Sequence, residues 1–246
     1  FDAYDHGDYR TTLRSGGDAM MRRSTGFTII ELTLAMAFIS VLLLSIVMTA
    51  IQAGRIYNRG AVLRSVNQAG RDVSDTLRRD FLQTNATKIK TDDSAPTSPV
   101  LEIRDGGEVV SSRFCLGQYS YLWNSPSILN DPDQWSRGGV EKAGSSPITF
   151  VRVDDPSGSF CMKLPSGDYP QLAATDKFMH LLKPITSNDV VIAVYRLAVT
   201  KITDVEEKPE QLYRVEFRLG TSATEEIDGA SCRPPNDAAS NVEFCA

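Results

Sequence analysis

Glu31 occupies a setting in which a carboxylate is costly. It is the only charged residue in the 25-residue run from Phe27 to Ile51. A charged side chain in the hydrocarbon core of a membrane costs about 3 kcal/mol or more, so such a residue usually pairs with an opposite charge or performs a function. Glu31 is therefore a candidate functional residue. The simpler alternative is a signal anchor that tolerates one acidic residue near its cytoplasmic end.

The run from 27 to 51 is long enough to cross a membrane. As a helix, 25 residues would extend about 37 Å, compared with about 30 Å for the hydrocarbon core of a bilayer. Arg22 and Arg23 precede the run, and basic residues favour the cytoplasmic side. The sequence thus predicts a single pass through the cytoplasmic (inner) membrane, with the following residues outside the cytoplasm.

The order Gly-Phe-Thr-Ile-Ile-Glu at residues 26–31, followed by the apolar run, resembles the processing site of the type IV pilin and pseudopilin family. In that family a prepilin peptidase cuts after the glycine, a methyltransferase modifies the new N-terminus, and a glutamate at the fifth mature position helps dock the subunit. The resemblance implies cleavage between Gly26 and Phe27, N-methylation of Phe27, and docking by Glu31. Unlike many pilins, the chain has no helix-kinking proline before Pro96.

The same resemblance implies how the chain is made and what it contacts. Residues 1–26 are expected to be a leader, or upstream sequence read in frame, that is absent from the working protein; a start at Met20 or Met21 would give a short leader. The implied partners are the prepilin peptidase, the major pilin, other minor pilins and the inner-membrane assembly platform. The implied destination is an extracellular pilus filament for motility, adhesion or DNA uptake.

Three features favour a larger minor pilin that helps start or modulate assembly: the 220 residues after Gly26, a second cysteine pair and a loop-rich head. A minor pseudopilin of a type II secretion system is an alternative. Another is a pilus-borne adhesin that binds a ligand through an aromatic group, although core packing of these residues is the simpler explanation. The group comprises Tyr119, Tyr121, Trp123 and Trp135.

Catalysis has little support in the sequence. It contains no Gly-x-Ser-x-Gly elbow, phosphate loop or HExxH motif, so we expect no enzyme, with a membrane-anchored enzyme kept as the alternative. His180, the only histidine after residue 26, is expected to be a partly buried structural residue. Two acidic pairs could bind calcium, but the prolines beside them favour ordinary turns. These pairs are Asp131 with Asp133 and Asp154 with Asp155.

All four cysteines lie in the last 132 residues, and a location outside the cytoplasm favours their oxidation. Four cysteines allow three pairings, of which we favour Cys115–Cys161 and Cys232–Cys245. The second would close a C-terminal loop that is poor in apolar residues, and it resembles the C-terminal disulfide loop of many type IV pilins. A zinc site is the alternative, but there is no CxxC motif, and we expect no metal.

Residues 52–84 are predicted to continue the membrane helix as an amphipathic helix, giving one helix from about Thr28 to Thr84. Apolar residues recur there at three- and four-residue steps: Val62, Val66, Ala69, Val73, Leu77 and Phe81. Bending or melting is plausible at Gly54, Gly60 and Gly70. Six arginines occupy the opposite face, where a solvated surface is a better explanation than nucleic-acid binding: Arg55, Arg59, Arg64, Arg71, Arg78 and Arg79.

Residues 85–246 are predicted to form one β-rich head, which makes the whole chain an α+β protein with a pilin-like antiparallel sheet laid on the second half of the helix. After a linker at 92–99, strands are expected at 100–104, 108–116, 119–123, 148–153, 158–164, 190–203 and 212–219, and a short helix at 175–182. The head has 23 acidic and 16 basic residues, whereas residues 52–84 have six arginines and three aspartates. This difference favours lateral packing of basic shafts against acidic heads.

Overall fold

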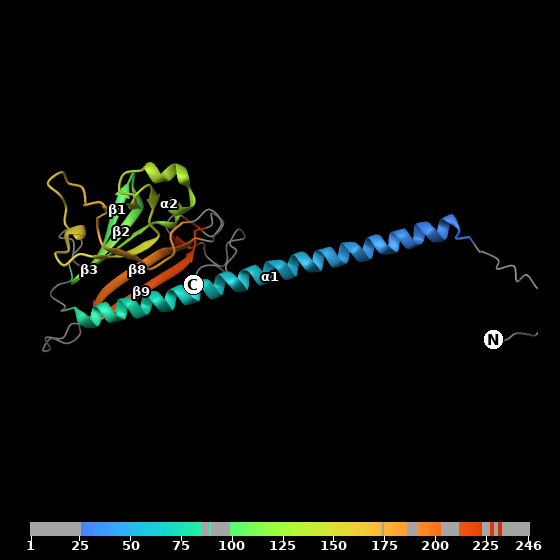
Figure 1. Ribbon diagram of the computed structural model, residues 1–246, viewed down its shortest axis with the longest axis horizontal. Coiled ribbons are helices and arrows are strands. Elements are labelled where there is room, and N and C mark those ends of the chain that lie inside the picture. The colour runs from blue at the N-terminus through green and yellow to red at the C-terminus, as the bar shows by residue number, and fades with distance from the viewer. Residues whose placement is uncertain are drawn as a thin grey trace, which may run out of the picture. The chain divides into compact units, whose positions relative to one another are not determined.

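The computed structural model describes residues 26–84, 89, 99–173, 175–185, 191–202, 212–222, 227–228 and 231–232. The chain divides into two compact units, Phe1–Gln52 and Ala53–Ala246. The first unit contributes the beginning of helix α1 (Ile29–Gln83), and the second contributes the rest of that helix together with every described strand. Figure 1 shows these elements along the chain.

Helix α1 begins and ends within one residue of the predicted bounds. Its apolar part is long enough to cross a membrane, by length and composition alone, and every described side chain of 26–52 is exposed. Hydroxyl groups in this part donate to carbonyls of the preceding turn, as Ser40 does to Met36 at 2.8 Å. Such internal bonds satisfy polar groups that would find no water in lipid. The helix continues through Gly54, Gly60 and Gly70, so the melting considered there is absent.

An antiparallel five-stranded sheet forms the centre of the second unit, in the order β1-β2-β3-β6-β7. The first three strands lie close to the predicted ranges: β1 (Val100–Asp105), β2 (Glu108–Leu116) and β3 (Tyr119–Asn124). A separate antiparallel hairpin of β8 (Ile192–Ile202) and β9 (Leu212–Thr221) was likewise expected. The predicted α+β layout of a long apolar helix followed by an antiparallel sheet is confirmed.

Two predicted elements are wrong. Residues 175–182 contain strand β7 (Phe178–His180), because their backbone pairs with β6 (Phe150–Asp154) rather than forming local helical bonds. Residues 158–164 contain the 3-10 turn η3 (Ser159–Cys161) instead of a strand. Gly158 turns the chain with a φ of 65°, a left-handed conformation that glycine adopts readily.

The segment between β3 and β6 contains several short elements. They are α2 (Pro126–Asn130), the 3-10 turn η2 (Pro132–Ser136), β4 (Lys142–Ala143) and β5 (Ser146–Pro147). Two further short strands, β10 (Ile227–Asp228) and β11 (Ser231–Cys232), pair with each other near the C-terminus.

The main core lies between the second half of α1, one face of the five-stranded sheet and the β8–β9 hairpin. Val66, Val73 and Leu77 of the helix are buried there against Phe114 of β2 and Leu197 of β8. In Figure 1 the end of α1 runs alongside β9. The amphipathic pattern of the helix is thus confirmed: Val62, Ala69 and Phe81 are partly buried against the same core.

The opposite face of the sheet packs against loops. Side chains alternate along a strand, so Cys115 of β2 lies opposite Phe114 and joins a second cluster with Leu122 and Val151. Phe160 and Leu172, from the chain after β6, cover this cluster. The head is therefore a sheet between a helix and a layer of loops, and the disulfide lies on the loop side.

Candidate functional site

The expected cleavage site lies just before α1. Gly26 and Phe27 precede the first helical residue, Ile29, and both are exposed. The Phe27 side chain is 82 % exposed, and apart from its chain neighbours no atom of the described residues lies within 4 Å of the position that a Cβ on Gly26 would occupy. Because this peptide bond lies outside the helical hydrogen-bond ladder, a peptidase could bind it without unwinding a helix.

Thr28 caps the helix immediately after this bond. Its Oγ1 accepts a hydrogen bond from the Glu31 amide at 3.2 Å, and its carbonyl accepts from the Leu32 amide at 3.1 Å. This is the arrangement of an N-cap residue, and Thr-x-x-Glu is the pattern of a capping box. The sequence analysis did not predict that Thr28 is the N-cap, although its three-residue spacing to Glu31 matches the capping-box pattern.

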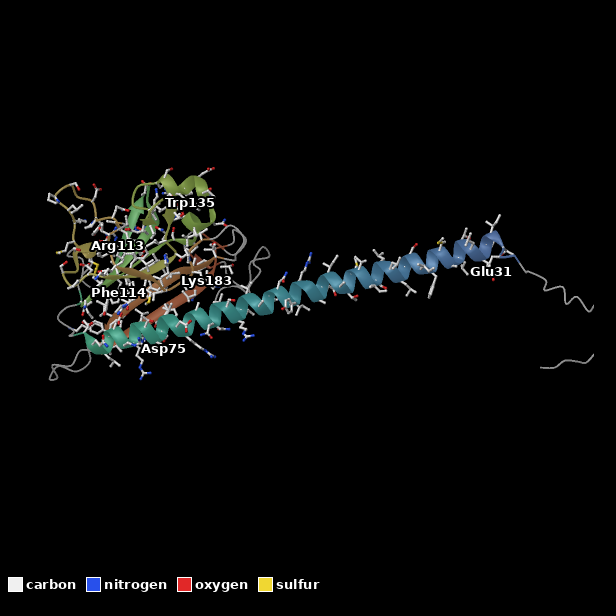
Figure 2. All side chains as sticks on the ribbon, viewed as in Figure 1. Glu31, Asp75, Arg113, Phe114, Trp135 and Lys183 are labelled. Atoms are coloured by element: carbon white, nitrogen blue, oxygen red, sulfur yellow. A yellow bond between two sulfur atoms is a disulfide. The ribbon has the colours of Figure 1, made fainter. Side chains whose placement is uncertain are left out.

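Glu31 lies in the first turn of α1, where a negative charge interacts favourably with the helix dipole. Its side chain is exposed (Figure 2). Within the described residues the Glu31 carboxylate forms no ion pair, so it is available to a cation from another molecule. The structure thus brings Gly26, Phe27 and Glu31 into one short accessible segment.

A second carboxylate on α1, Asp80, is buried against the sheet. It is 1 % exposed and accepts two hydrogen bonds from Arg152 of β6, at 2.6 and 2.9 Å, and one from the Tyr121 hydroxyl of β3 at 2.5 Å. The Arg152 guanidinium also lies 3.2 Å from the centre of the Tyr119 ring. These contacts hold the end of the helix in one position on the sheet.

The Asp80 contacts also shift the proton affinities of the groups that bind it. Burial raises the pKa of Tyr121, and the hydrogen bond to Asp80 raises it further. Burial lowers the pKa of Arg152, but the hydrogen bond and charge of Asp80 outweigh this effect, so its pKa is raised. At ordinary pH the Tyr121 hydroxyl therefore stays protonated and Arg152 stays positively charged. The sequence analysis did not predict the buried contacts of Asp80. The position of this aspartate, three residues after Leu77 on the apolar face of the helix, could have indicated that it is buried.

Arg113 and Glu141 form a buried ion pair on the loop side of the sheet, and both side chains are fully buried. Arg113 also donates to the Phe160 carbonyl at 2.8 Å, while Asn124 bonds the backbone amide and carbonyl of Glu141. Burial lowers the pKa of Arg113 and raises that of Glu141, although each charge partly offsets the effect on the other. Nothing in the sequence pattern indicated this pair, which holds the loop before β4 on the sheet.

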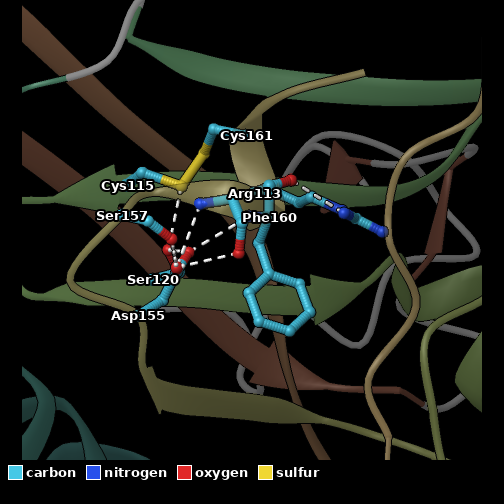
Figure 3. Close-up of a disulfide and its surroundings, with 8 residues drawn as sticks. Arg113, Cys115, Ser120, Asp155, Ser157, Phe160 and Cys161 are labelled. Carbon is cyan, nitrogen blue, oxygen red and sulfur yellow. Dashed lines mark hydrogen bonds between the residues drawn. A yellow bond between two sulfur atoms is a disulfide. The ribbon is translucent and has the colours of Figure 1, made fainter. Parts of the chain in front are cut away.

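The expected disulfide between Cys115 and Cys161 is confirmed, with 6.2 Å between their Cα atoms. It joins β2 to η3 on the loop side of the sheet (Figure 3). The expected pair Cys232–Cys245 lies outside the residues whose side chains the structure describes.

The acidic pairs considered for calcium lie in or beside turns. Asp131 accepts from the Asp133 amide at 3.0 Å at the start of η2. Asp155 accepts hydrogen bonds from side chains and amides of its own loop, whereas Asp154 is exposed. No group of three or more metal-ligating side chains occurs in the described part of the chain.

The aromatic residues considered as a ligand platform are mainly core residues. Tyr121 and Trp123 are buried, and both rings pack against Phe150. Trp135 is half-buried and donates to the Ile128 carbonyl at 3.0 Å. Core packing, the simpler of the two explanations, is therefore correct for Tyr121 and Trp123.

His180 is less buried than expected. It is exposed on the edge strand β7, with its ring edge-on to Phe178. Burial of part of the ring lowers its pKa.

Comparison with known proteins adds no assignment, since no family model, no curated protein and no solved structure matches this chain.

Proposed function

We propose that the chain is a minor pilin-like subunit, cleaved between Gly26 and Phe27 and assembled through α1 into a type IV pilus-like filament. The observation that carries the proposal is the segment Gly26–Glu31. An accessible peptide bond is followed at once by a capped helix with an exposed carboxylate in its first turn. The helix then continues without a break into the head.

Cleavage would give Phe27 a free amino group, which carries a positive charge. In a filament of parallel helices, Glu31 of one subunit can pair with the Phe27 amino group of its neighbour. Each charge is costly to bury alone, and pairing removes most of that cost, although the net gain over solvent is modest. The pair therefore sets the register of adjacent helices, while packing of the apolar side chains from Leu32 to Ile51 supplies the cohesion.

The α+β arrangement of the head supports this proposal. Its sheet packs on the second half of α1 and leaves the apolar first half exposed, which suits a subunit whose helix first lies in lipid and later in a filament core. Such a layout is compatible with a pilin-like fold. The same features suit a minor pseudopilin of a secretion system.

Replacing Glu31 tests the proposal. We expect Glu31→Ala to leave cleavage largely intact but to reduce incorporation into filaments by about tenfold or more, the effect of losing about 1.4 kcal/mol. Asp75→Ala is the matched control, because Asp75 is an exposed carboxylate on the same helix. The measurement is the amount of subunit in sheared filaments relative to the amount in membranes. Efficient incorporation of Glu31→Ala would refute the docking role.

A further inference from the structure

One carboxylate holds the loop that carries Cys161 (Figure 3). Asp155 is 4 % exposed and directly follows β6. Its Oδ1 accepts from the Ser157 hydroxyl at 2.9 Å, and from the amide and hydroxyl of Ser159 at 3.0 and 2.9 Å. Its Oδ2 accepts from the Phe160 amide at 3.1 Å. We call the Asp155 carboxylate and its donors the Asp155 clasp.

The clasp also reaches the strand beside the partner cysteine. The Ser120 hydroxyl on β3 donates to Asp155 Oδ2 at 2.7 Å and lies 2.9 Å from Cys115 Sγ. Ser120 and Cys115 are paired residues on neighbouring strands. The same carboxylate thus ties the sheet next to Cys115 to the turn that bears Cys161.

These contacts position Cys161 without the help of a sulfur–sulfur bond. Phe160, the residue before it, is held at both ends, because its amide donates to Asp155 and its carbonyl accepts from Arg113 at 2.8 Å. The Cys161 amide in turn donates to the Gly158 carbonyl at 3.2 Å. All of these partners are amides, carbonyls, hydroxyls or charged side chains that exist in the reduced chain.

We propose that the Asp155 clasp selects the disulfide pairing by placing Cys161 beside Cys115 while both are still thiols. Four cysteines allow three pairings, and fixing two of them in contact strongly raises their effective concentration for each other. Asp155 is a positioning residue, since its negative charge does not favour a neighbouring thiolate. The proposal concerns folding of the head and does not depend on the function proposed above.

Burial indicates the order of the chemical steps. Cys161 is half-buried and Cys115 is 2 % exposed, so the Cys161 thiolate attacks an external disulfide donor first, forming a mixed disulfide and releasing one donor thiolate. The Cys115 thiolate then attacks Cys161 Sγ and releases the second donor thiolate. Two protein thiols are oxidised, the donor disulfide is reduced to two thiols, and the two protein protons pass through solvent to the donor thiolates.

Re-oxidation of the full chain in detergent micelles tests the proposal. The protein is reduced under native conditions and re-oxidised with oxidised glutathione, and the pairs are identified by mass mapping of peptides. We expect the wild type to form Cys115–Cys161 selectively. We expect Asp155→Asn to form it about tenfold more slowly and to give mixed pairings, because proximity is lost. Asp154→Asn, at the exposed neighbouring carboxylate, should behave as the wild type. Unchanged rate and pairing in Asp155→Asn would overturn the proposal.

A second variant keeps the proposal testable if Asp155→Asn does not fold. The double variant Cys115→Ser, Cys161→Ser removes the disulfide and keeps the clasp. We expect the amides of Ser159 and Phe160 to remain protected from hydrogen exchange in this variant. Loss of that protection would mean that the disulfide orders the loop, which contradicts the proposed sequence of events.

Discussion

At the scale of single residues, two carboxylates on α1 meet opposite surroundings. Glu31 is exposed and has no ion-pair partner among the described residues, whereas Asp80 is 1 % exposed and is bonded by Arg152 and Tyr121. The two side chains carry the same functional group, but their different burial gives them different roles. Glu31 is available for contacts between molecules, and Asp80 contributes to the stability of the head.

Asp80→Ala should destabilise the head by about 3 kcal/mol, because it leaves the Arg152 guanidinium and the Tyr121 hydroxyl without their partner in a largely buried place. Asp75→Ala, at an exposed position of the same helix, should change the free energy of unfolding by less than about 0.5 kcal/mol. Urea unfolding, followed by the fluorescence of the buried Trp123, measures both variants. Equal stability of the two would contradict the role of Asp80.

Asp155 should make the stability of the head depend on pH in the acidic range. Burial raises the pKa of this carboxyl, but hydrogen bonds from the Phe160 amide, the Ser120 hydroxyl and Ser159 outweigh that effect, so its pKa lies below the usual 3.8. A depressed pKa in the folded state means that its contribution is present above about pH 3.8 and is lost as pH falls through the folded-state pKa. We expect Asp155→Asn to have a flatter dependence of unfolding free energy on pH below 4. An unchanged slope would contradict this assignment.

At the scale of elements, the local sequence pattern predicted α1, β1, β2, β3, β8 and β9 well. The second half of α1 and strand β9 each have one buried face that repeats along the chain. Strands β2 and β3 are buried on both faces and are marked instead by short runs bounded by turn residues. The same reasoning failed for β7 and η3. These segments are short, and pairing with β6 or bonding to Asp155 decides their conformation. Contacts between residues distant in the sequence, such as Asp80 with Arg152, are hard to predict from the local pattern of residue types.

One glycine in the second half of α1 and one in the turn between β2 and β3 should respond in opposite directions to substitution by alanine. At Gly70 an added Cβ would lie 4.0 Å from Leu219 and Phe217, an ordinary contact distance. Gly70→Ala should therefore raise the free energy of unfolding by up to about 1 kcal/mol, because alanine has the higher helix propensity.

At Gly117 φ is +63°, and an added Cβ would lie 2.6 Å from Thr84. Gly117→Ala should therefore destabilise the head by more than about 1 kcal/mol. Urea unfolding of each variant distinguishes these outcomes, and destabilisation by Gly70→Ala would show that the helix cannot accept the extra methyl group.

At the scale of the whole molecule, an apolar helix compatible with a membrane span leads into a disulfide-bonded head. The sequence allowed a prediction of both parts and of the Cys115–Cys161 pair. It did not indicate the whole Asp155 clasp, because Ser120 is 35 residues away from Asp155 along the chain. The candidate site at Gly26, Phe27 and Glu31 was predicted from the resemblance of residues 26–31 to the pilin processing site, and the structure adds the cap at Thr28.

The N-terminus of the chain in cells with an active prepilin peptidase tests the central claim most directly. The chain is purified from membranes of these cells, and its N-terminal peptide is sequenced by mass spectrometry. Cells lacking the peptidase are the matched control and should retain residues before Gly26. The proposed function predicts a chain that begins at Phe27 with an N-methyl group. A chain that keeps Gly26 and the preceding residues in the presence of active peptidase would contradict it.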